Sequence, residues 1–300
     1  MEAGPYFAGV ELGGTKSIAL LAQGRKVVQQ SRILTTTPQE TLRAISDQLL
    51  AWREEVEFAG LGIASFGPIE LAPRAARYGH MLRTPKAGWQ DAGIAQALTS
   101  GLDCPWKIDT DVNAAALAEY RWGAGVGLDS VCYVTIGTGV GGGLVIEGMP
   151  VHGALHPEMG HLRLRRAPGD AFPGACPFHG DCIEGLVSGP ALAARMSCDP
   201  AEVPDDDERW QAVACDLAEL ACAVLLVTAA QRILIGGGVG MARASLLPSV
   251  RREAVARLGG YLPFFDDDSA EEIIRAPMLG HEAGPLGAIA LGHAAAGELF

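Results

Sequence analysis

Hydrophobic and polar residues alternate along this chain in two different rhythms. Residues 7–33 carry apolar runs separated by glycine-containing turns, which predicts two or three β-strands. Residues 131–151 repeat the same succession of strand, glycine turn, strand and turn. The repetition predicts a duplicated unit in which each half opens with a glycine-bearing β-hairpin.

Helical patterns occupy the intervals between these strands. Residues 37–56 have the spacing of an amphipathic helix, with Thr37 as N-cap and Pro38 in the first helical position. Further elements alternate in kind: a strand over 58–70, a strand end leading into an alanine-rich helix over 109–123, a strand over 232–240 and a closing helix over 284–300. Strands alternating with helices in two similar halves predict an α/β fold with a cleft between two lobes.

Composition narrows the class of protein. The 300 residues are 49% hydrophobic, which allows a sizeable core and two domains of ordinary size. A net charge of −12 without a basic run argues against nucleic acid as a partner. The first residues do not resemble a signal peptide, and the most apolar window, residues 217–230, contains Glu219 and is too short to cross a membrane. Together with scattered cysteines, these features predict a cytoplasmic protein with no membrane partner.

Three glycine turns follow apolar strands. Glycine lets the backbone approach a ligand and exposes N–H groups, while a neighbouring Thr or Lys adds a hydroxyl or a charge, as phosphate requires. Each turn alone fits an ordinary hairpin, but three at matched places in a duplicated fold favour ligand binding. The GxGxxG pattern at 137–142 does not predict a dinucleotide site, because a strand follows it instead of a helix. The candidate residues are Gly13, Gly14, Thr15 and Lys16; Thr138 and Gly139; and Gly236, Gly237, Gly238, Val239 and Gly240.

A second candidate site lies within residues 156–185. Cys176, His179 and Cys182 follow one another at a spacing of three, which allows all of them to bind one ion. Two thiolates and two imidazoles make a neutral tetrahedral zinc site, and His161 is the best fourth ligand. A metal would order this Pro-, Gly- and Asp-containing loop, whereas a Cys176–Cys182 disulfide is disfavoured in a reducing compartment. Histidines without such neighbours are expected on the surface: His80, His152 and His156.

The three glycine segments resemble the nucleotide loops of the actin, hexokinase and Hsp70 ATPase superfamily. VELGGTK is similar to the first phosphate loop, TIGTGVGGG to the second and ILIGGGVG to the adenosine loop. Their order and spacing resemble the ROK family (repressor, open reading frame, kinase) over the whole chain. This resemblance implies a duplicated, two-lobed ribonuclease-H-like fold, with a smaller lobe of residues 1–118 completed by 286–300 and a larger lobe of residues 119–285 that carries the zinc loop.

The resemblance also implies an ATP- and Mg²⁺-dependent hexose kinase, often dimeric in this family. Glu11 stands where most members have Asp, and its longer carboxylate should still reach a magnesium-bound water. Asp111 stands at the position of the general base, which accepts the proton of the attacking sugar hydroxyl. Spacing alone leaves a simpler alternative open, in which Asp109 or Asp111 only caps the helix that follows.

Sugar recognition is implied by further matches. In the family, the residues that match Glu158, His161 and Glu184 bind sugar hydroxyls, so His161 would bind zinc through one ring nitrogen and sugar through the other. Glu184 could instead sit in the first turn of a helix for the sake of the helix dipole. Gly67 and Thr110 complete the predicted sugar site. Thr110 replaces the Asn of glucose-phosphorylating members, which argues against glucose.

A few residues indicate which subgroup of the ROK family the chain resembles. RTPKAGWQD, Glu11, Thr110 and His179 resemble the fructokinases, so fructose 6-phosphate is the expected product. Glucokinase, mannokinase and amino-sugar kinase remain alternatives, because hexoses differ by a few hydrogen bonds. A non-catalytic ROK repressor would need an N-terminal helix-turn-helix, whereas the first phosphate loop begins about a dozen residues from Met1.

Overall fold

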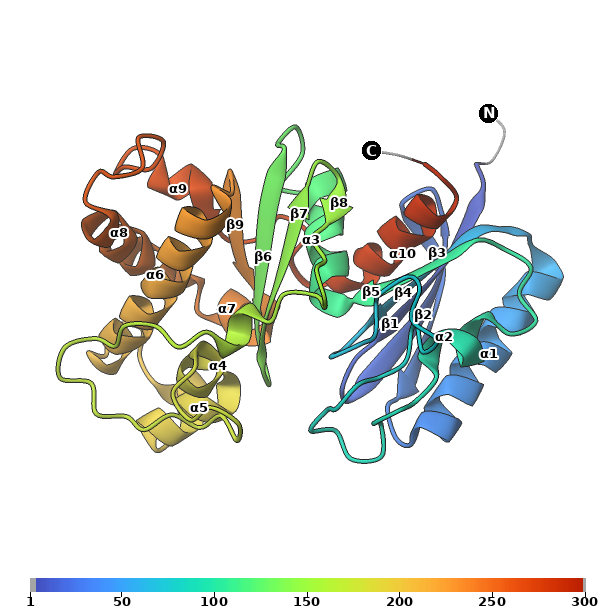
Figure 1. Cartoon of the computed structure of the whole chain (residues 1–300), viewed down its shortest axis with the longest axis horizontal. Coiled ribbons are helices and arrows are strands. Elements are labelled where there is room, and N and C mark those ends of the chain that lie inside the picture. The colour runs from blue at the N-terminus through green and yellow to red at the C-terminus, as the bar shows by residue number, and fades with distance from the viewer. Residues whose placement is uncertain (1–3, 299–300) are drawn as a thin grey trace. The chain divides into compact units, whose positions relative to one another are not determined.

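The computed structural model describes residues 4–298, and these residues form two compact units. One unit comprises residues up to Gly123 together with Val145–Pro157 and the segment from Glu282 onward. The other comprises Ala124–Leu144 and Glu158–His281. Each unit contains most or all of one five-stranded sheet (Figure 1). The lobe boundaries expected from the sequence stay a prediction.

The first sheet has the strand order β3-β2-β1-β4-β5. β1 and β2 form an antiparallel hairpin, whereas β4 runs parallel to β1 and β5 runs parallel to β4. The glycine turn predicted within residues 7–33 connects β1 to β2, so the expected hairpin is confirmed. The strands are β1 (Tyr6–Leu12), β2 (Lys16–Gln23), β3 (Lys26–Leu34), β4 (Phe58–Ser65) and β5 (Trp106–Thr110).

Helices cover both faces of this sheet. On one face, α1 (Pro38–Glu55) and α2 (Ile94–Thr99) pack into a core with the side chains of β1 and β4. On the other face, α10 (Ala283–Ala295) lies against strands β1 and β4 and beside α3 (Asp111–Trp122) (Figure 1). Gly62 allows this close contact, because a Cβ atom there would lie 1.9 Å from the carbonyl oxygen of Ala288.

The N-terminus of α1 follows the predicted capping pattern. The Thr37 hydroxyl accepts a hydrogen bond from the Glu40 N–H, and Pro38 occupies the first helical turn. The Glu40 carboxylate in turn accepts from the Thr37 hydroxyl at 3.0 Å. The predicted helix start is therefore confirmed, and the apolar face of the helix is buried against the sheet.

The second sheet repeats the first topology. Its order is β10-β9-β6-β7-β8, so β6 to β10 correspond one by one to β1 to β5. The duplication predicted from the two glycine hairpins is confirmed. The strands are β6 (Ser130–Ile136), β7 (Val140–Ile146), β8 (Met149–Pro150), β9 (Arg232–Gly236) and β10 (Ile274–Arg275). The helices of this part of the chain are α4 (Ile183–Val187), α5 (Gly189–Met196), α6 (Arg209–Thr228), α7 (Gly237–Ala242), α8 (Leu247–Leu258) and α9 (Ala270–Ile273).

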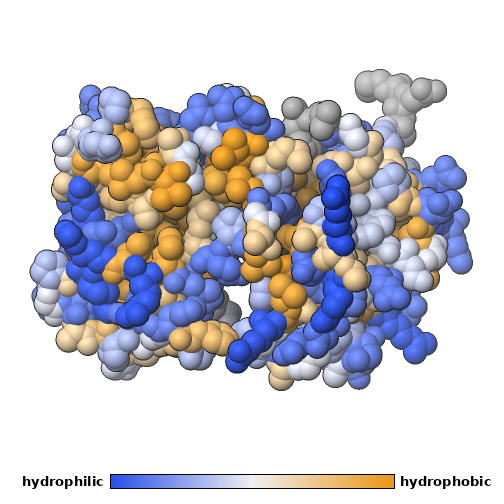
Figure 2. Space-filling model, viewed as in Figure 1, coloured by the Kyte–Doolittle hydropathy of each residue, from blue (hydrophilic) through white to orange (hydrophobic). Residues whose placement is uncertain are grey.

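Helix α6 contains the most apolar stretch of the chain. By length and composition alone, its 20 residues are sufficient to cross a membrane, and it is longer than the apolar window suggested. However, 61% of its most apolar 18-residue window is buried inside the protein, where α6 packs against α8. Its exposed hydrophobic residues are Leu226 and Val227 near the C-terminal end. Hydrophobic residues also gather in patches on the visible face of the protein (Figure 2). The expectation that this stretch is too short to cross a membrane is therefore wrong on length, and its burial makes α6 a core helix of the fold.

Candidate functional site

The first glycine turn is a tight connection between β1 and β2. The Thr35 hydroxyl donates to Gly13 O at 2.8 Å, and the Thr35 N–H donates to Thr15 O at 3.0 Å. The ammonium of Lys86 donates to Gly14 O. Gly13 cannot carry a side chain here, since a Cβ atom would lie 2.5 Å from the carbonyl oxygen of Lys16. Thr35 and Lys86, which lie outside the turn, therefore fix its conformation.

Two carboxylates lie at the N-termini of the paired helices α3 and α10. Asp111 is the first residue of α3, and a Cβ atom on Gly284 in the first turn of α10 would touch the Glu11 carboxylate. Burial raises the pKa of Glu11 to about 7; the charge of Asp111 raises it further, while Lys16 lowers it. Burial also raises the pKa of Asp111 to about 6. Two close carboxylates with raised pKa values favour a nearby cation.

The helix cap at Asp111 differs from both capping possibilities considered for the sequence. The N-cap is Thr110, whose hydroxyl accepts from the Asn113 N–H at 3.2 Å. Asp109 instead accepts from the Thr110 N–H at 2.7 Å and from the Asn113 side-chain amide at 2.8 Å. The alternative in which Asp109 or Asp111 is the N-cap of α3 is therefore wrong, although the Asp111 carboxylate accepts from the Val112 N–H at 2.8 Å. Thr110, predicted to face the sugar, is buried and serves the helix start.

His152 and His156 were expected on the surface, and this expectation is wrong for His156, which is buried. Its Nε2 accepts from the Ile69 N–H at 3.2 Å, and its ring lies beside Gly67. His152 is exposed, as expected, and its Nε2 pairs with Asp109 at 2.9 Å, a hydrogen bond that raises the pKa of the imidazole. No periodic pattern in the sequence indicates this pair, since its members come from distant segments.

The second glycine turn, Gly137–Gly139, links β6 to β7. Its backbone is closed by the Gly137 N–H donating to Gly139 O at 2.9 Å, and Gly137 O accepts from the Gly189 N–H at 2.8 Å. Thr138 is exposed at the tip. Glu184, in the first turn of α4, accepts from the Val140 N–H at 3.2 Å. Part of the Glu184 carboxylate thus holds the base of this turn.

The third glycine segment departs from the predicted loop. β9 ends at Gly236, and the following glycines form the first turn of the short helix α7. Gly237 takes a φ of +78°, and a Cβ atom there would lie 2.5 Å from the backbone of Ile136. The sequence suggested a loop because glycine usually interrupts helices. Gly238 remains exposed, and Val239 is half-buried.

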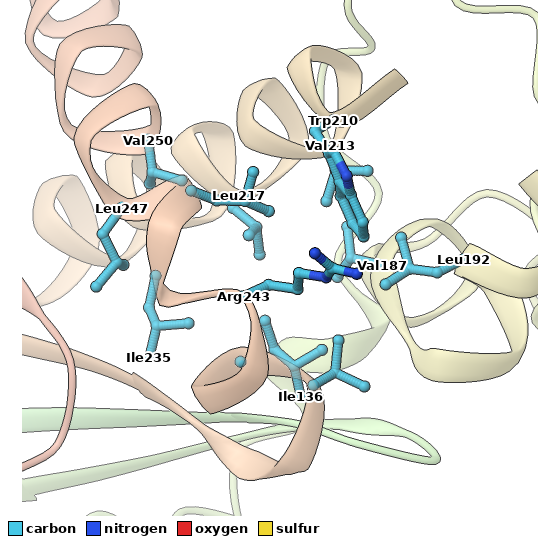
Figure 3. A pocket seen from close by; sticks show the side chains of 13 residues that line it. Ile136, Val187, Leu192, Trp210, Val213, Leu217, Ile235, Arg243, Leu247 and Val250 are labelled. Carbon is cyan, nitrogen blue, oxygen red and sulfur yellow. The ribbon is translucent and has the colours of Figure 1, made fainter. Parts of the chain in front are cut away.

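A small cavity of about 20 Å³ lies behind this third segment. Val239 and Gly240 line it together with apolar side chains from α6 and α8, and Arg243 stacks over the Trp210 ring at 4.7 Å (Figure 3). Arg243 is itself paired with Asp205. A cavity of this size has room for about one water molecule, so it is not itself a nucleotide site.

Four side chains form a candidate metal centre. The ligand atoms of His161, Cys176, His179 and Cys182 all lie within 4.8 Å of one another. The Nδ1 of His161 lies 3.6 Å from the Cys182 sulfur and 3.9 Å from the Cys176 sulfur, and His179 Nδ1 lies 3.8 Å from Cys176. A tetrahedral zinc with bonds of about 2.0–2.3 Å has ligand separations of roughly 3.3–3.8 Å. The residues therefore fit a zinc ion.

The chemistry of the donors agrees with this geometry. Cys176 and Cys182 are free thiols, so the alternative of a disulfide between them is wrong for this structure. Burial raises the pKa of Cys182 to about 11, which keeps the thiol protonated unless a cation binds. A tight turn presents the ligands, since Cys176 and Gly180 exchange backbone hydrogen bonds at 3.1 and 2.9 Å. Glu158 directly precedes the short 3₁₀ turn Met159–His161.

The predicted site residues thus fall into two groups. The first unit brings together Glu11, residues 13–16, Gly67, Thr110 and Asp111, and the second carries residues 138–139, Glu158, His161, Glu184, residues 236–240 and the metal ligands. Two contacts in the first unit were not predicted from the sequence: Lys86 with Gly14 O, and Asp109 with His152. Lys86 belonged to a noted motif, but its contact with a loop 72 positions away carried no sequence signal.

Comparison with known proteins identifies the family of this chain. The model of the ROK family matches residues 7–295. The chain belongs to the ROK family. Among curated ROK proteins, it is 41% identical to the fructokinase of Zymomonas mobilis (95% of this chain and 96% of that protein) and 35% identical to that of Lactococcus lactis (91% and 92%). A solved ROK hexokinase from Thermus thermophilus superposes with a TM-score of 0.78 at 26% identity, over 96% of this chain and 98% of that one.

Proposed function

We propose that this ROK protein transfers the γ-phosphoryl group of ATP to the 6-hydroxyl of D-fructose. The observation that carries the proposal is the identity of 35–41% to fructokinases over at least 91% of the chain. The first glycine turn, with its exposed backbone and Lys16, supports nucleotide phosphate binding.

Asp111 is the proposed general base. It accepts the proton of the sugar hydroxyl while the new O–P bond forms and the bond from the γ-phosphorus to ADP breaks. The assignment is supported by the cap, which Thr110 supplies, and by the raised pKa of Asp111, whose Oδ1 accepts from the Val112 N–H at 2.8 Å at the helix start. Glu11 would hold a magnesium-bound water, and Mg²⁺ would neutralise phosphate charge there.

The zinc cluster is proposed to support the sugar site. The Nδ1 atom of His161 faces the cysteine sulfurs, so its Nε2 remains for a sugar hydroxyl. Glu158 and Glu184 adjoin the cluster in sequence, and carboxylates accept hydroxyl protons well. The one hydrogen bond that Glu184 accepts from Val140 leaves further acceptor capacity on its carboxylate. A homodimer and a cytoplasmic location stay predictions from the sequence.

One coupled assay tests the proposal. Purified enzyme is given ATP and Mg²⁺ with fructose, mannose, glucose or N-acetylglucosamine, and ADP release is followed. We expect the highest kcat/KM with fructose. A higher value with glucose would favour the glucokinase alternative, and no turnover with any of the four sugars would contradict the hexose kinase assignment.

A further inference from the structure

Three successive carbonyl groups of the first glycine turn are held by residues outside it. Thr35 donates to Gly13 O through its hydroxyl and to Thr15 O through its N–H. Lys86 donates to the carbonyl between them, Gly14 O. Thr35 is itself buried, and its hydroxyl lies 2.8 Å from that of Ser17. The two outer carbonyls are therefore fixed by the core, whereas the middle one depends on Lys86.

The direction of the Gly14 carbonyl also sets the direction of the Thr15 N–H. In a planar trans peptide unit, the C=O and the N–H point in opposite directions. Gly14 O and the Thr15 N–H belong to one such unit. Because glycine rotates freely about its backbone bonds, the Gly14–Thr15 peptide has few steric barriers to turning over. A hydrogen bond from Lys86 to Gly14 O thus aims the Thr15 N–H away from Lys86.

Lys86 belongs to a segment with firm anchors, residues 82–92, which we call the strap. Trp89 is fully buried, its Nε1 donates to Thr36 O at 2.9 Å, and its ring meets Phe66 at 5.1 Å. At the start of the strap, the Leu82 N–H donates to Pro68 O at 2.8 Å. These contacts fix the backbone around Lys86, and its ammonium reaches Gly14 O from this anchored segment.

We propose that Lys86 is a positioning residue for ATP, which aims the Thr15 N–H at the nucleotide phosphates by holding the Gly14 carbonyl. A charged donor suits this task, since charge-assisted hydrogen bonds are stronger than neutral ones. An N–H fixed in direction before the ligand arrives needs no reorganisation on binding. The inference rests on the ATP-dependent activity proposed above and concerns the nucleotide, not Asp111 or the sugar.

Calorimetry on the full, zinc-loaded protein tests this inference. In Lys86→Met, we expect ATP affinity to fall by about 10- to 100-fold, as for a lost charged hydrogen bond, with adenosine affinity unchanged. Lys86→Arg, which can still reach the carbonyl, should recover most of the ATP affinity. The matched control is Lys26→Met, which removes an exposed ammonium from the same unit and should leave both affinities unchanged. Thermal melting verifies that each variant folds.

Crystal structures of the ligand-free wild type and Lys86→Met supply the decisive readout. We expect the Gly14–Thr15 peptide to turn only in the variant. Unchanged ATP affinity, or an equal loss for adenosine, overturns the inference. An ATP loss with the peptide unturned also overturns it, because Lys86 would then act as a direct phosphate ligand. Normal ATP binding in a wild type that phosphorylates no sugar would refute the proposed function and leave this inference intact.

Discussion

The two halves of this ROK chain share a strand order but differ in their connections. Between β3 and β4, the first half has a connection of residues 35–57 built around one helix, α1. Between the corresponding strands β8 and β9, the second half has residues 151–231, which contain the candidate metal centre and the helices α4 to α6. Duplication thus supplies two equivalent scaffolds, and the longer connection supplies the additional chemistry.

The strand ends differ in the same way. β5 delivers Asp111 to the start of α3, whereas the corresponding β10 is only two residues long and is followed by Ala276 and Pro277. The hairpin turns also differ, since the first is held by Thr35 and Lys86 and the second by its own backbone, Gly189 and Glu184. A shared topology therefore does not give the two halves the same task. The following experiments test that division.

The largest expected effect concerns Asp111, the proposed general base, which follows β5 and has no counterpart after β10. Asp111→Asn removes the proton acceptor but leaves the Thr110 cap, so we expect kcat to fall by roughly 10²- to 10⁴-fold with little change in fructose affinity or melting temperature. Steady-state kinetics and calorimetry measure these quantities. Asp47→Asn, which changes an exposed carboxylate on α1, is the control. Near-normal turnover of Asp111→Asn would contradict its role as the base.

The pH profile sharpens the same assignment. A general base must be ionised, and burial raises the pKa of Asp111 to about 6. We therefore expect kcat to be full above this value and to decline as the pH falls through about 6. A binding cation would shift the decline to lower pH, because it favours the ionised form. A decline centred well above pH 7 would assign the limiting group elsewhere.

The next effect concerns the metal cluster of the second half. Cys182→Ser removes a buried thiolate ligand, so we expect zinc content to fall from about one ion per chain, a lower melting temperature and a KM for fructose raised by about tenfold or more. Elemental analysis, thermal melting and kinetics measure these changes. Cys198→Ser, at an exposed cysteine, should alter none of them. Wild-type protein that lacks zinc without exposure to chelator would contradict the metal assignment.

A smaller effect concerns the glycines of β1 and β4 that lie against α10. Gly62→Ala would place Cβ 1.9 Å from Ala288 O, so α10 must move, and we expect a loss of about 1–3 kcal/mol in the free energy of unfolding. Urea unfolding measures it. Gly4→Ala is a suitable control, since a Cβ atom there meets no atom within 4 Å. Equal stability of the two variants would show that the sheet tolerates a side chain at position 62.

The smallest effect concerns the Asp109–His152 pair. This hydrogen bond raises the pKa of His152, so the stabilisation is fully present below the unfolded pKa and is lost as the pH rises through the folded pKa. Because His152 is about one-third exposed, we expect less than about 1 kcal/mol. The stability difference between wild type and His152→Gln should be largest near pH 5.5 and close toward pH 8. A difference that grows with pH would contradict this linkage.

Local signals made much of the fold predictable. Thr37 and Pro38 defined the start of α1, and two glycine hairpins at matched places revealed the duplication. The cysteine and histidine spacing grouped three metal candidates, and the family resemblance supported His161 beside them. Each of these signals lies within a short stretch of chain, where residue type and spacing constrain the local geometry directly.

The features that the sequence did not reveal depend on tertiary contacts. His152 and Lys86 have partners 43 and 72 positions away, and neither side chain differs in local pattern from a solvated residue. Thr110 was assigned to the sugar because its role as a cap depends on where β5 ends. The glycines after β9 begin a helix because Gly237 packs against Ile136, which only the assembled sheet supplies.

The position of α10 has a consequence for synthesis on the ribosome. Strands β1 and β4 are made early, yet the helix that covers their glycine face lies beyond residues 66–282. Until that helix emerges, Gly9, Gly60 and Gly62 face no partner, and the nascent first sheet has one uncovered side. The second sheet and its metal loop are translated entirely within this interval. The first sheet, although translated first, therefore cannot be completed until the C-terminal helix has been made.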